Sequence, residues 1–327
     1  MREPLYRQAL IHSWKLACQH RFLWIFGLFA TLLGQMGILE LFSKVTMASS
    51  DYALYPKWLV IPKLLKYLFT GFGEFNMPFD GWIWLVWLLL ILLGFFVFFV
   101  FVSVASQGAL IHAAAKSVKH KHLPDVGKSW HVGVSHFWRL FSLNLVKKIV
   151  MVTLAVAVGY GALNFIVIES GWGLLLFLVL FLLSILVGMV LSFLVIYAAG
   201  YIVVEEYSFL DALEASWKLF ISHWLVSIEV GLLVLFLNVV LIFAVLIGFF
   251  VLFLPTILTW AIAASLGSYT LYILGVLVGS TLFLFFALAL GSFFTVYVTS
   301  VWTYMFMKMH KDGVVSRILH WGGHCKK

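Results

Sequence analysis

Ionisable side chains inside apolar stretches are the first candidates for chemistry in this chain. Glu229 lies within the apolar stretch 225–254, and Lys147 and Lys148 stand at the start of another, 149–168. A charge inside a membrane is costly and usually has a function, so a Glu229–lysine pair between two helices is one interpretation. The alternative is that all three side chains extend to the membrane surface. We predict that Glu229 faces the protein interior near one of the lysines.

Two histidine clusters raise the question of a metal site. They comprise His120, His122, His131 and His136, and then His320, His324 and Cys325. A structural zinc site needs about four ligands at defined spacing, and neither cluster matches a known ligand pattern. We therefore expect no metal and no cofactor.

Motifs for catalysis are missing from the sequence. There is no Gly-rich phosphate loop, serine nucleophile elbow or H-E-x-x-H motif. The acidic residues Glu205, Glu206, Asp211 and Glu214 are interpreted as a solvated face opposite the basic segment 116–139. We expect no enzymatic activity.

Other polar and small residues suggest helix packing. Gly275 and Gly279 form a GxxxG pair, and Gly188 with Ser192 forms a looser version. Small residues at this spacing let membrane helices approach closely. The partner helix can belong to the same chain or to a second copy. Asn144, Asn164 and Asn238 are expected to form hydrogen bonds between helices.

The composition identifies the environment of these residues. Of 327 residues, 64% are hydrophobic and 10% charged, whereas a soluble domain carries roughly 25% charged residues. Most of the apolar surface must therefore face lipid. The net charge of +8 suggests contact with anionic headgroups. Nucleic acid is not the expected partner, because the basic residues are scattered among short segments.

Long apolar runs predict six membrane spans. These are approximately 22–42, 82–106, 149–168, 174–204, 225–254 and 271–301. The first run could instead belong to a cleaved signal peptide, but its length exceeds the ~7–15 residues of a signal core. Of the Lys and Arg residues, 17 lie on the side of the termini and 4 on the other. The positive-inside rule therefore places both termini in the cytoplasm of a cell membrane. No disulfide is expected between Cys18 and Cys325, because both lie on the cytoplasmic side.

One phrase occurs three times, each time before an odd-numbered span. Ser-Trp is followed, after five residues, by His: HSWKLACQH at 12–20, KSWHVGVSH at 128–136 and ASWKLFISH at 215–223. Each phrase has the apolar spacing of an amphipathic helix, and Ser208 with Asp211 resembles a capping box before the third. We predict that Trp14, Trp130 and Trp217 anchor three helices at the membrane surface.

The phrases imply an all-α polytopic membrane protein with one domain, 1–327. It would contain three parallel repeats of a surface helix plus a helical hairpin, at about 4–114, 124–204 and 208–310, followed by a cytoplasmic tail, 311–327. The outer loop stretch 55–69 is expected to form a further interfacial helix. Mitochondrial carriers also have three hairpins, but the nearest match to their Pro-x-acid-x-x-base motif here, at 78–83, lacks the base.

The stretches GALIHAAAKSVKHKHLPDVGKSWHVGVSHFWRLFSLNLV and YIVVEEYSFLDALEASWKLFISHWLVSI resemble the cytoplasmic connections of bacterial six-span proteins. These are the YciC-like inner-membrane proteins and the membrane domain attached to some glycerophosphoryl diester phosphodiesterases. The resemblance implies a membrane module and assigns no catalytic residue. We expect a non-enzymatic module that organises lipids or holds a protein partner or a second copy. The alternative is a transporter with a path through the bundle.

Overall fold

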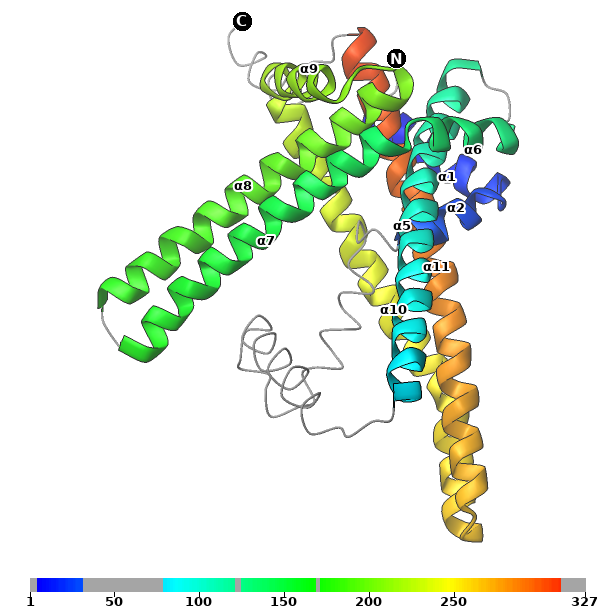
Figure 1. Cartoon of the computed structure of the whole chain (residues 1–327). Helices are drawn as coiled ribbons and strands as arrows, with labels where there is room; N and C mark the ends of the chain where they lie inside the picture. The colour runs from blue at the N-terminus through cyan, green and yellow to red at the C-terminus, as the bar shows by residue number, and fades with distance from the viewer. Residues whose placement is uncertain (1–4, 32–78, 121–124, 169–170, 313–327) are drawn as a thin grey trace, which may run out of the picture.

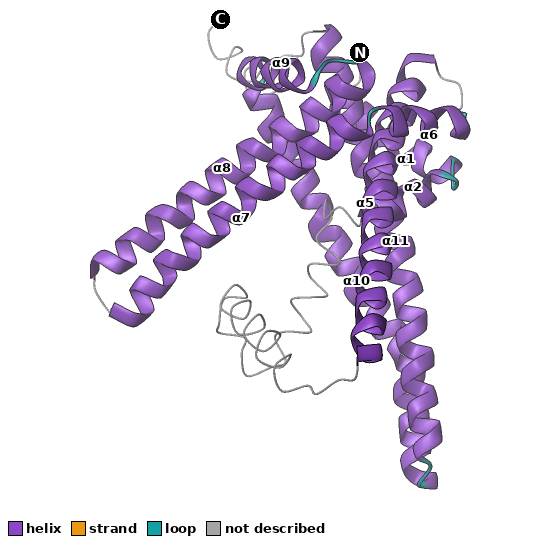
Figure 2. Ribbon diagram, viewed as in Figure 1, coloured by secondary structure: helices purple, strands orange, loops and turns teal. Residues whose placement is uncertain are grey.

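The computed structural model describes residues 5–31, 79–120, 125–168 and 171–312, and these residues are helical apart from short connections. The helices, shown in Figures 1 and 2, are α1 (Leu5–Gln19), α2 (Leu23–Ala30), α5 (Phe79–His120), α6 (Val126–Ser135), α7 (Phe137–Ile168), α8 (Gly171–Val204), α9 (Phe209–Ser222), α10 (Trp224–Leu266) and α11 (Tyr269–Asp312). The prediction of an all-α membrane protein is confirmed at this level.

Five of the described helices are long and apolar enough to cross a membrane. They are α5, α7, α8, α10 and α11, and most of their apolar side chains are exposed on the protein surface. Phe96 in α5 is 64% exposed and Phe250 in α10 is 69% exposed, which suits contact with lipid rather than water. The expected first span, 22–42, lies within the described residues only up to Thr31. The expected helix 55–69 lies wholly outside them.

The long helices extend further than the apolar runs predicted. Helix α5 continues past the expected end at 106 to His120, and α7 begins at Phe137 rather than near 149. Helix α10 passes through Pro255 to Leu266. A proline inside a membrane helix is tolerated when neighbouring groups satisfy the freed backbone, so a proline at the edge of an apolar run did not mark the helix end.

The turn between α10 and α11 is short and well defined. Gly267 has a φ of 61°, and the N–H of Ser268 bonds to the carbonyl of Ala263 at 3.0 Å. This is a Schellman motif, in which glycine accepts the left-handed conformation at little cost. It joins α10 and α11 into an antiparallel hairpin, and α7 and α8 pack together as a second hairpin.

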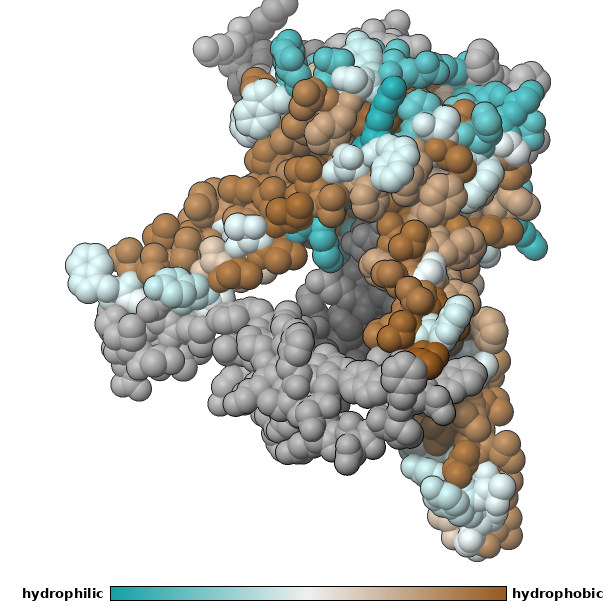
Figure 3. Space-filling model, viewed as in Figure 1, coloured by the Kyte–Doolittle hydropathy of each residue, from teal (hydrophilic) through white to brown (hydrophobic). Residues whose placement is uncertain are grey.

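The two complete hairpins diverge from each other. Helix α5 runs beside α11, α10 slants from beneath α9 to meet α11, and the α7–α8 hairpin projects obliquely to the other side (Figure 1). The short helices α6 and α9 cross the long ones at the end of the molecule where α1 begins and α11 ends. Hydrophilic atoms gather at this end, and apolar atoms cover the hairpins (Figure 3).

The protein core lies beneath the short helices. The buried residues of α5, α8 and α11 concentrate at 102–115, 193–203 and 294–309, in the parts of these helices nearest the hydrophilic end. Alanines such as Ala113, Ala198 and Ala199 are fully or almost fully buried, and small side chains let helices approach each other closely. The other ends of the hairpins have few neighbours, which leaves their surfaces for lipid.

Candidate functional site

A cavity of about 540 Å³ lies between the diverging hairpins. All five long helices contribute to its lining: Gln107 and Ile111 from α5; Lys147 from α7; Met189, Ser192, Phe193, Val195, Ile196, Ala199 and Gly200 from α8; Gly231, Val234, Leu235 and Asn238 from α10; and Thr295, Val298, Thr299, Trp302, Thr303 and Phe306 from α11. Ligand sites in proteins are commonly apolar cavities of roughly 300–1,000 Å³ with a few polar groups. This cavity has that size and composition.

The cavity opens sideways towards the lipid. Met189 of α8 and Leu235 of α10 both line it, and they are 40% and 61% exposed. The gap between these two helices therefore connects the cavity with the surroundings of the apolar spans. A molecule can enter from the bilayer without crossing the hydrophilic end.

Most polar groups of the lining are satisfied within the helices. The Asn238 amide N–H donates to the Val234 carbonyl at 2.9 Å, and Thr303 Oγ1 donates to the Thr299 carbonyl at 2.8 Å. Such back-bonding to the preceding turn removes the need for an external partner. The donor groups of Gln107, Thr299, Lys147 and Trp302 make no such bond among the described residues.

The Gln107 side chain is held by a neighbouring amide. Asn144 Nδ2 donates to Gln107 Oε1 at 2.8 Å and to the Leu140 carbonyl at 2.9 Å. The bond occupies the Gln107 oxygen and leaves its N–H groups as donors beside the cavity. The expectation that Asn144 bonds across helices agrees with this contact between α7 and α5. Asn164 falls outside the residues whose side chains are described.

Lys147 carries the cavity's charge. Its side chain lies on the lining, whereas the adjacent Lys148 is exposed and lies off the lining. Within the described chain, Lys147 makes no hydrogen bond or ion pair, and the residues of the lining include no Asp or Glu. As far as the described residues line it, the cavity is therefore an apolar space with one ammonium group and no carboxylate beside it.

Glu229 has a different neighbour from the one predicted. Its Oε2 accepts a hydrogen bond from the Tyr6 hydroxyl of α1, and neither Lys147 nor Lys148 pairs with it among the described residues. The Glu229–lysine pair therefore stays a prediction. In this region α1 contributes a phenol donor, while α7 packs on α8 and α5 and diverges from α10.

The three repeated phrases occupy corresponding places in their helices. Ser13, Ser129 and Ser216 are each no more than 1% exposed, and the histidine that ends each phrase follows directly on the last residue of α1, α6 or α9. His136 and His223 also accept or donate a side-chain bond with the serine before them, at 3.0 and 2.8 Å. The phrase therefore marks a buried serine and the bend from a short helix into the next helix.

The tryptophans of these phrases lie at the edges of the buried faces. Trp14 and Trp217 are 53% and 48% exposed, and Trp14 packs edge-on against Phe293 of α11. Trp130 is partly buried and stacks on Phe26. The buried side of α9 is formed by Ala212, Ser216 and Leu219 rather than by a stripe centred on Trp217. The prediction of three equivalent interface anchors remains a prediction.

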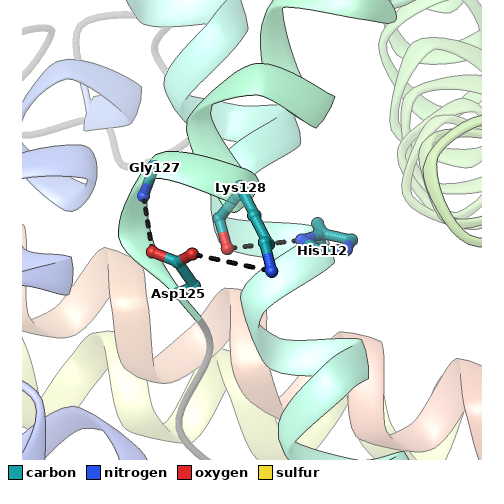
Figure 4. A network of polar contacts seen from close by, with 5 residues as sticks. His112, Asp125, Gly127 and Lys128 are labelled. Atoms are coloured by element: carbon teal, nitrogen blue, oxygen red, sulfur yellow. Dashed lines mark hydrogen bonds and ion pairs between the residues drawn. The ribbon is translucent and has the colours of Figure 1, made fainter.

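Polar contacts fasten the short helices to the long ones. Asp125 caps α6, since its Oδ1 accepts from the Gly127 N–H at 3.2 Å, and it also faces Lys128 (Figure 4). The His112 ring of α5 lies 3.3 Å from Ser129 Oγ, at the second repeated serine. His12 Nε2 of α1 likewise lies 2.8 Å from Ser117 Oγ of α5.

The burial of the His12 side chain affects its protonation. Desolvation lowers the pKa of His12 below its ordinary value of 6.5, and the charge of Lys15 lowers it further. The ring is thereby kept neutral near pH 7 while it contacts Ser117 and the Tyr304 ring.

Glycines allow the closest helix crossings. A Cβ on Gly133 of α6 would overlap backbone atoms of Ala105 and Ala109 in α5. Cβ atoms on Gly275 and Gly279 would overlap the hydroxyls of Thr259 and Thr256 in α10, so the neighbour of this GxxxG pair is in the same chain. Gly188 has room for a Cβ, with Met151 Sδ at 3.6 Å, and the Ser192 hydroxyl donates to the Gly188 carbonyl.

Other sequence candidates give no shared site. The described residues contain no group of three or more His, Cys, Asp or Glu side chains able to hold a metal ion. His122, His320, His324 and Cys325 lie outside the described part of the chain, and Cys18 is an exposed free thiol. Of the acidic residues, Glu214 pairs with Lys218 at 2.6 Å. Arg139 reaches the backbone carbonyl of Glu206 rather than its carboxylate.

Sequence reasoning overlooked the neutral polar groups of the cavity. Thr295, Thr299 and Thr303 recur every four residues and so share one face of α11. That period was a usable signal within an otherwise apolar run. Gln107 was missed because it lies one residue beyond the expected end of the second span.

Comparison with protein-family models, with curated proteins and with solved structures found no match to this chain. Its class therefore follows from the fold and site: the described chain is all-helical, with five helices able to span a membrane and a cavity between helical hairpins.

Proposed function

We propose that this protein is a non-enzymatic membrane module that organises lipids by holding a membrane-derived amphipathic molecule in the central cavity. The single observation that supports this most is the cavity's form: an apolar space of about 540 Å³, polar on part of its lining and open to the side between α8 and α10. An amphipathic molecule can place its polar end inside and leave its apolar part in the bilayer.

The position of the polar groups favours binding over passage. Lys147 lies eleven residues beyond His136, and Thr303 lies nine residues before the end of α11, so the polar lining belongs to the half nearest the short helices. Towards the other end, α10 and α11 close on each other through Gly279 and Thr256. A transporter, the second candidate, would need a polar route across both halves.

The proposal includes a threefold arrangement. Helix α6 packs on α5 and α9 packs on α8, so each rests on the long helix that precedes it, while α1 packs on α11, the last. This cyclic order supports three repeats of a surface helix plus a hairpin, with the first unit completed by residues beyond Thr31. Six spans, the amphipathic role of α1, α6 and α9, and cytoplasmic termini in a bacterial inner membrane belong to the same proposal.

The test is to fill the cavity. Ser192→Phe places a ring in the cavity from α8, and Leu182→Phe places the same ring on the exposed side of that helix. Leu182 is a suitable control position because its side chain is 63% exposed, whereas the Ser192 hydroxyl lines the cavity and donates to the Gly188 carbonyl at 2.8 Å. Each protein is extracted in a mild detergent, and its retained lipid is counted by native mass spectrometry.

We expect Ser192→Phe to lose tightly held lipid and Leu182→Phe to match the unaltered protein. Equal retention by all three would refute the cavity as the lipid site. Substrate flux into vesicles containing the purified protein, blocked by Ser192→Phe, would instead support the transporter.

A further inference from the structure

The positive charge of Lys147 indicates what kind of molecule the cavity can bind. Lys147 is the one ionisable side chain among the described lining residues, and it has no hydrogen-bond or ion-pair partner in the described chain. An ammonium group removed from water is stabilised by a counter-ion or by a high-dielectric surrounding. The described lining residues supply no carboxylate, and an anionic occupant would supply the negative charge that Lys147 lacks among them.

Two neutral donors accompany the ammonium. The Gln107 N–H groups remain available because its oxygen binds Asn144, and the Thr299 hydroxyl lines the cavity without a hydrogen bond to the described residues. Charge-assisted bonds from such donors are the usual means of holding a phosphate oxygen. Together the three side chains offer donors and one positive charge, which suits a single anionic group.

The surroundings of Lys147 decide between a lipid and a soluble anion. The lysine lies about 16 Å along α7 from His136, at a rise of ~1.5 Å per residue. Its cavity has walls of Val, Ile, Leu and Phe and opens past Met189 and Leu235. A free phosphate would gain nothing from these walls, whereas lipid chains would fill the opening.

We propose that the cavity selects an anionic glycerophospholipid, whose phosphate binds Lys147, Gln107 and Thr299 while its acyl chains leave between α8 and α10. This assignment rests on the proposed function, because it names the class of lipid that the same cavity takes. It predicts that the protein prefers an anionic phospholipid to a zwitterionic one, a preference that burial of acyl chains alone would not produce.

Lys148 provides the control. It has the same charge and lies next in the chain, but it is exposed and away from the lining. Lys147→Gln removes the cavity charge, Lys148→Gln removes an equal charge outside it, and Lys147→Arg restores the charge. Correct folding of each variant is checked by its elution volume and helical circular dichroism.

The delipidated proteins are exchanged into nanodiscs containing equal amounts of phosphatidylglycerol and phosphatidylcholine, and the lipid that remains bound after extraction is identified. We expect the unaltered protein, Lys148→Gln and Lys147→Arg to retain mainly phosphatidylglycerol. Lys147→Gln should lose this preference by about tenfold, the size of one charge-assisted hydrogen bond. A preference equal in Lys147→Gln and Lys148→Gln would overturn the assignment.

Two further results separate the alternatives. If inorganic phosphate in excess displaces the bound lipid, the site belongs to a free anion and the lipid assignment is wrong. If Ser192→Phe reduces total retained lipid while Lys147→Gln leaves the lipid class unchanged, the proposed function stands and the anionic selectivity fails. If Ser192→Phe has no effect, the proposed function fails first.

Discussion

Replacing Gly133 with alanine should loosen the docking of α6 on α5. The added Cβ would overlap the Ala105 carbonyl oxygen and the Ala109 nitrogen, and both are backbone atoms of a long helix that cannot rotate away. Inserting one carbon into such a contact costs roughly 1–3 kcal/mol. Exchanging glycine for alanine inside a helix regains about 1 kcal/mol. Because the overlap is with fixed backbone atoms, we expect the steric cost to lie in the upper part of its range. The expected net loss of stability for Gly133→Ala is therefore about 1–2 kcal/mol.

Gly127 in the same helix is the matched control. Its added Cβ would meet nothing nearer than Asp125 Oδ1 at 3.8 Å, so Gly127→Ala should keep or slightly raise stability. Thermal unfolding followed by tryptophan fluorescence suits both variants, because Trp130 lies between these glycines and stacks on Phe26. Midpoints that are equal for Gly133→Ala and Gly127→Ala would refute the close α5–α6 crossing.

Three other substitutions test separate contacts by the same unfolding assay. Tyr6→Phe removes the hydroxyl that bonds to Glu229 and should lower the free energy of unfolding by about 1–3 kcal/mol. Tyr269→Phe, at a residue 75% exposed, should have little effect. Similar unfolding midpoints for the two variants would argue against the Tyr6–Glu229 bond. Gly279→Leu should destabilise the α10–α11 hairpin, because the new side chain would overlap Thr256. Gly94→Leu should not, because a Cβ at Gly94 has no neighbouring atom within 4 Å. An unchanged unfolding midpoint for Gly279→Leu would contradict the tight crossing of α10 and α11. The lowered pKa of His12 means that the folded protein binds fewer protons there than the unfolded chain, so its contribution to stability is present above pH 6.5 and is lost as the pH falls below that value. His12→Gln should therefore weaken the decline of the midpoint below pH 6.5, His131→Gln should not, and an unchanged decline in His12→Gln would show that His12 does not titrate as inferred.

Local sequence signals predicted the helical elements well. The apolar runs located five long helices, and Ser208 caps α9 as expected: its hydroxyl accepts from the Asp211 N–H at 3.4 Å and donates to the Asp211 carboxylate at 2.6 Å. These features depend on residues close together in the chain. The helix ends were less predictable, because Pro255 and the polar residues after Ser106 can remain helical when neighbouring helices support them.

The site could be predicted only in part. Lys147 was recognised because a charge inside an apolar run is unusual, but its environment depends on how far the α7–α8 hairpin diverges from α10. That divergence is a property of packing between distant segments, and it places Lys147 on the lining of a cavity. The contact between Tyr6 and Glu229 spans 223 residues, so no local pattern indicated it.

The repeated phrases show the same limit at a smaller scale. Their tryptophans attracted the functional interpretation because of their size, yet it is Ser13, Ser129 and Ser216 that the fold buries in all three phrases, each to 1% exposure or less. A small side chain permits the short helix to lie close to its neighbour, and spacing alone does not distinguish a buried serine from an exposed tryptophan beside it.

The most direct test of the account is an electron cryomicroscopy map of the protein in nanodiscs that contain phosphatidylglycerol. The account predicts elongated density that begins at Lys147, passes between Met189 and Leu235 and continues into the bilayer, and that is absent from the Ser192→Phe map. A cavity closed by α8 against α10, or one that holds no density beyond ordered water, would contradict it.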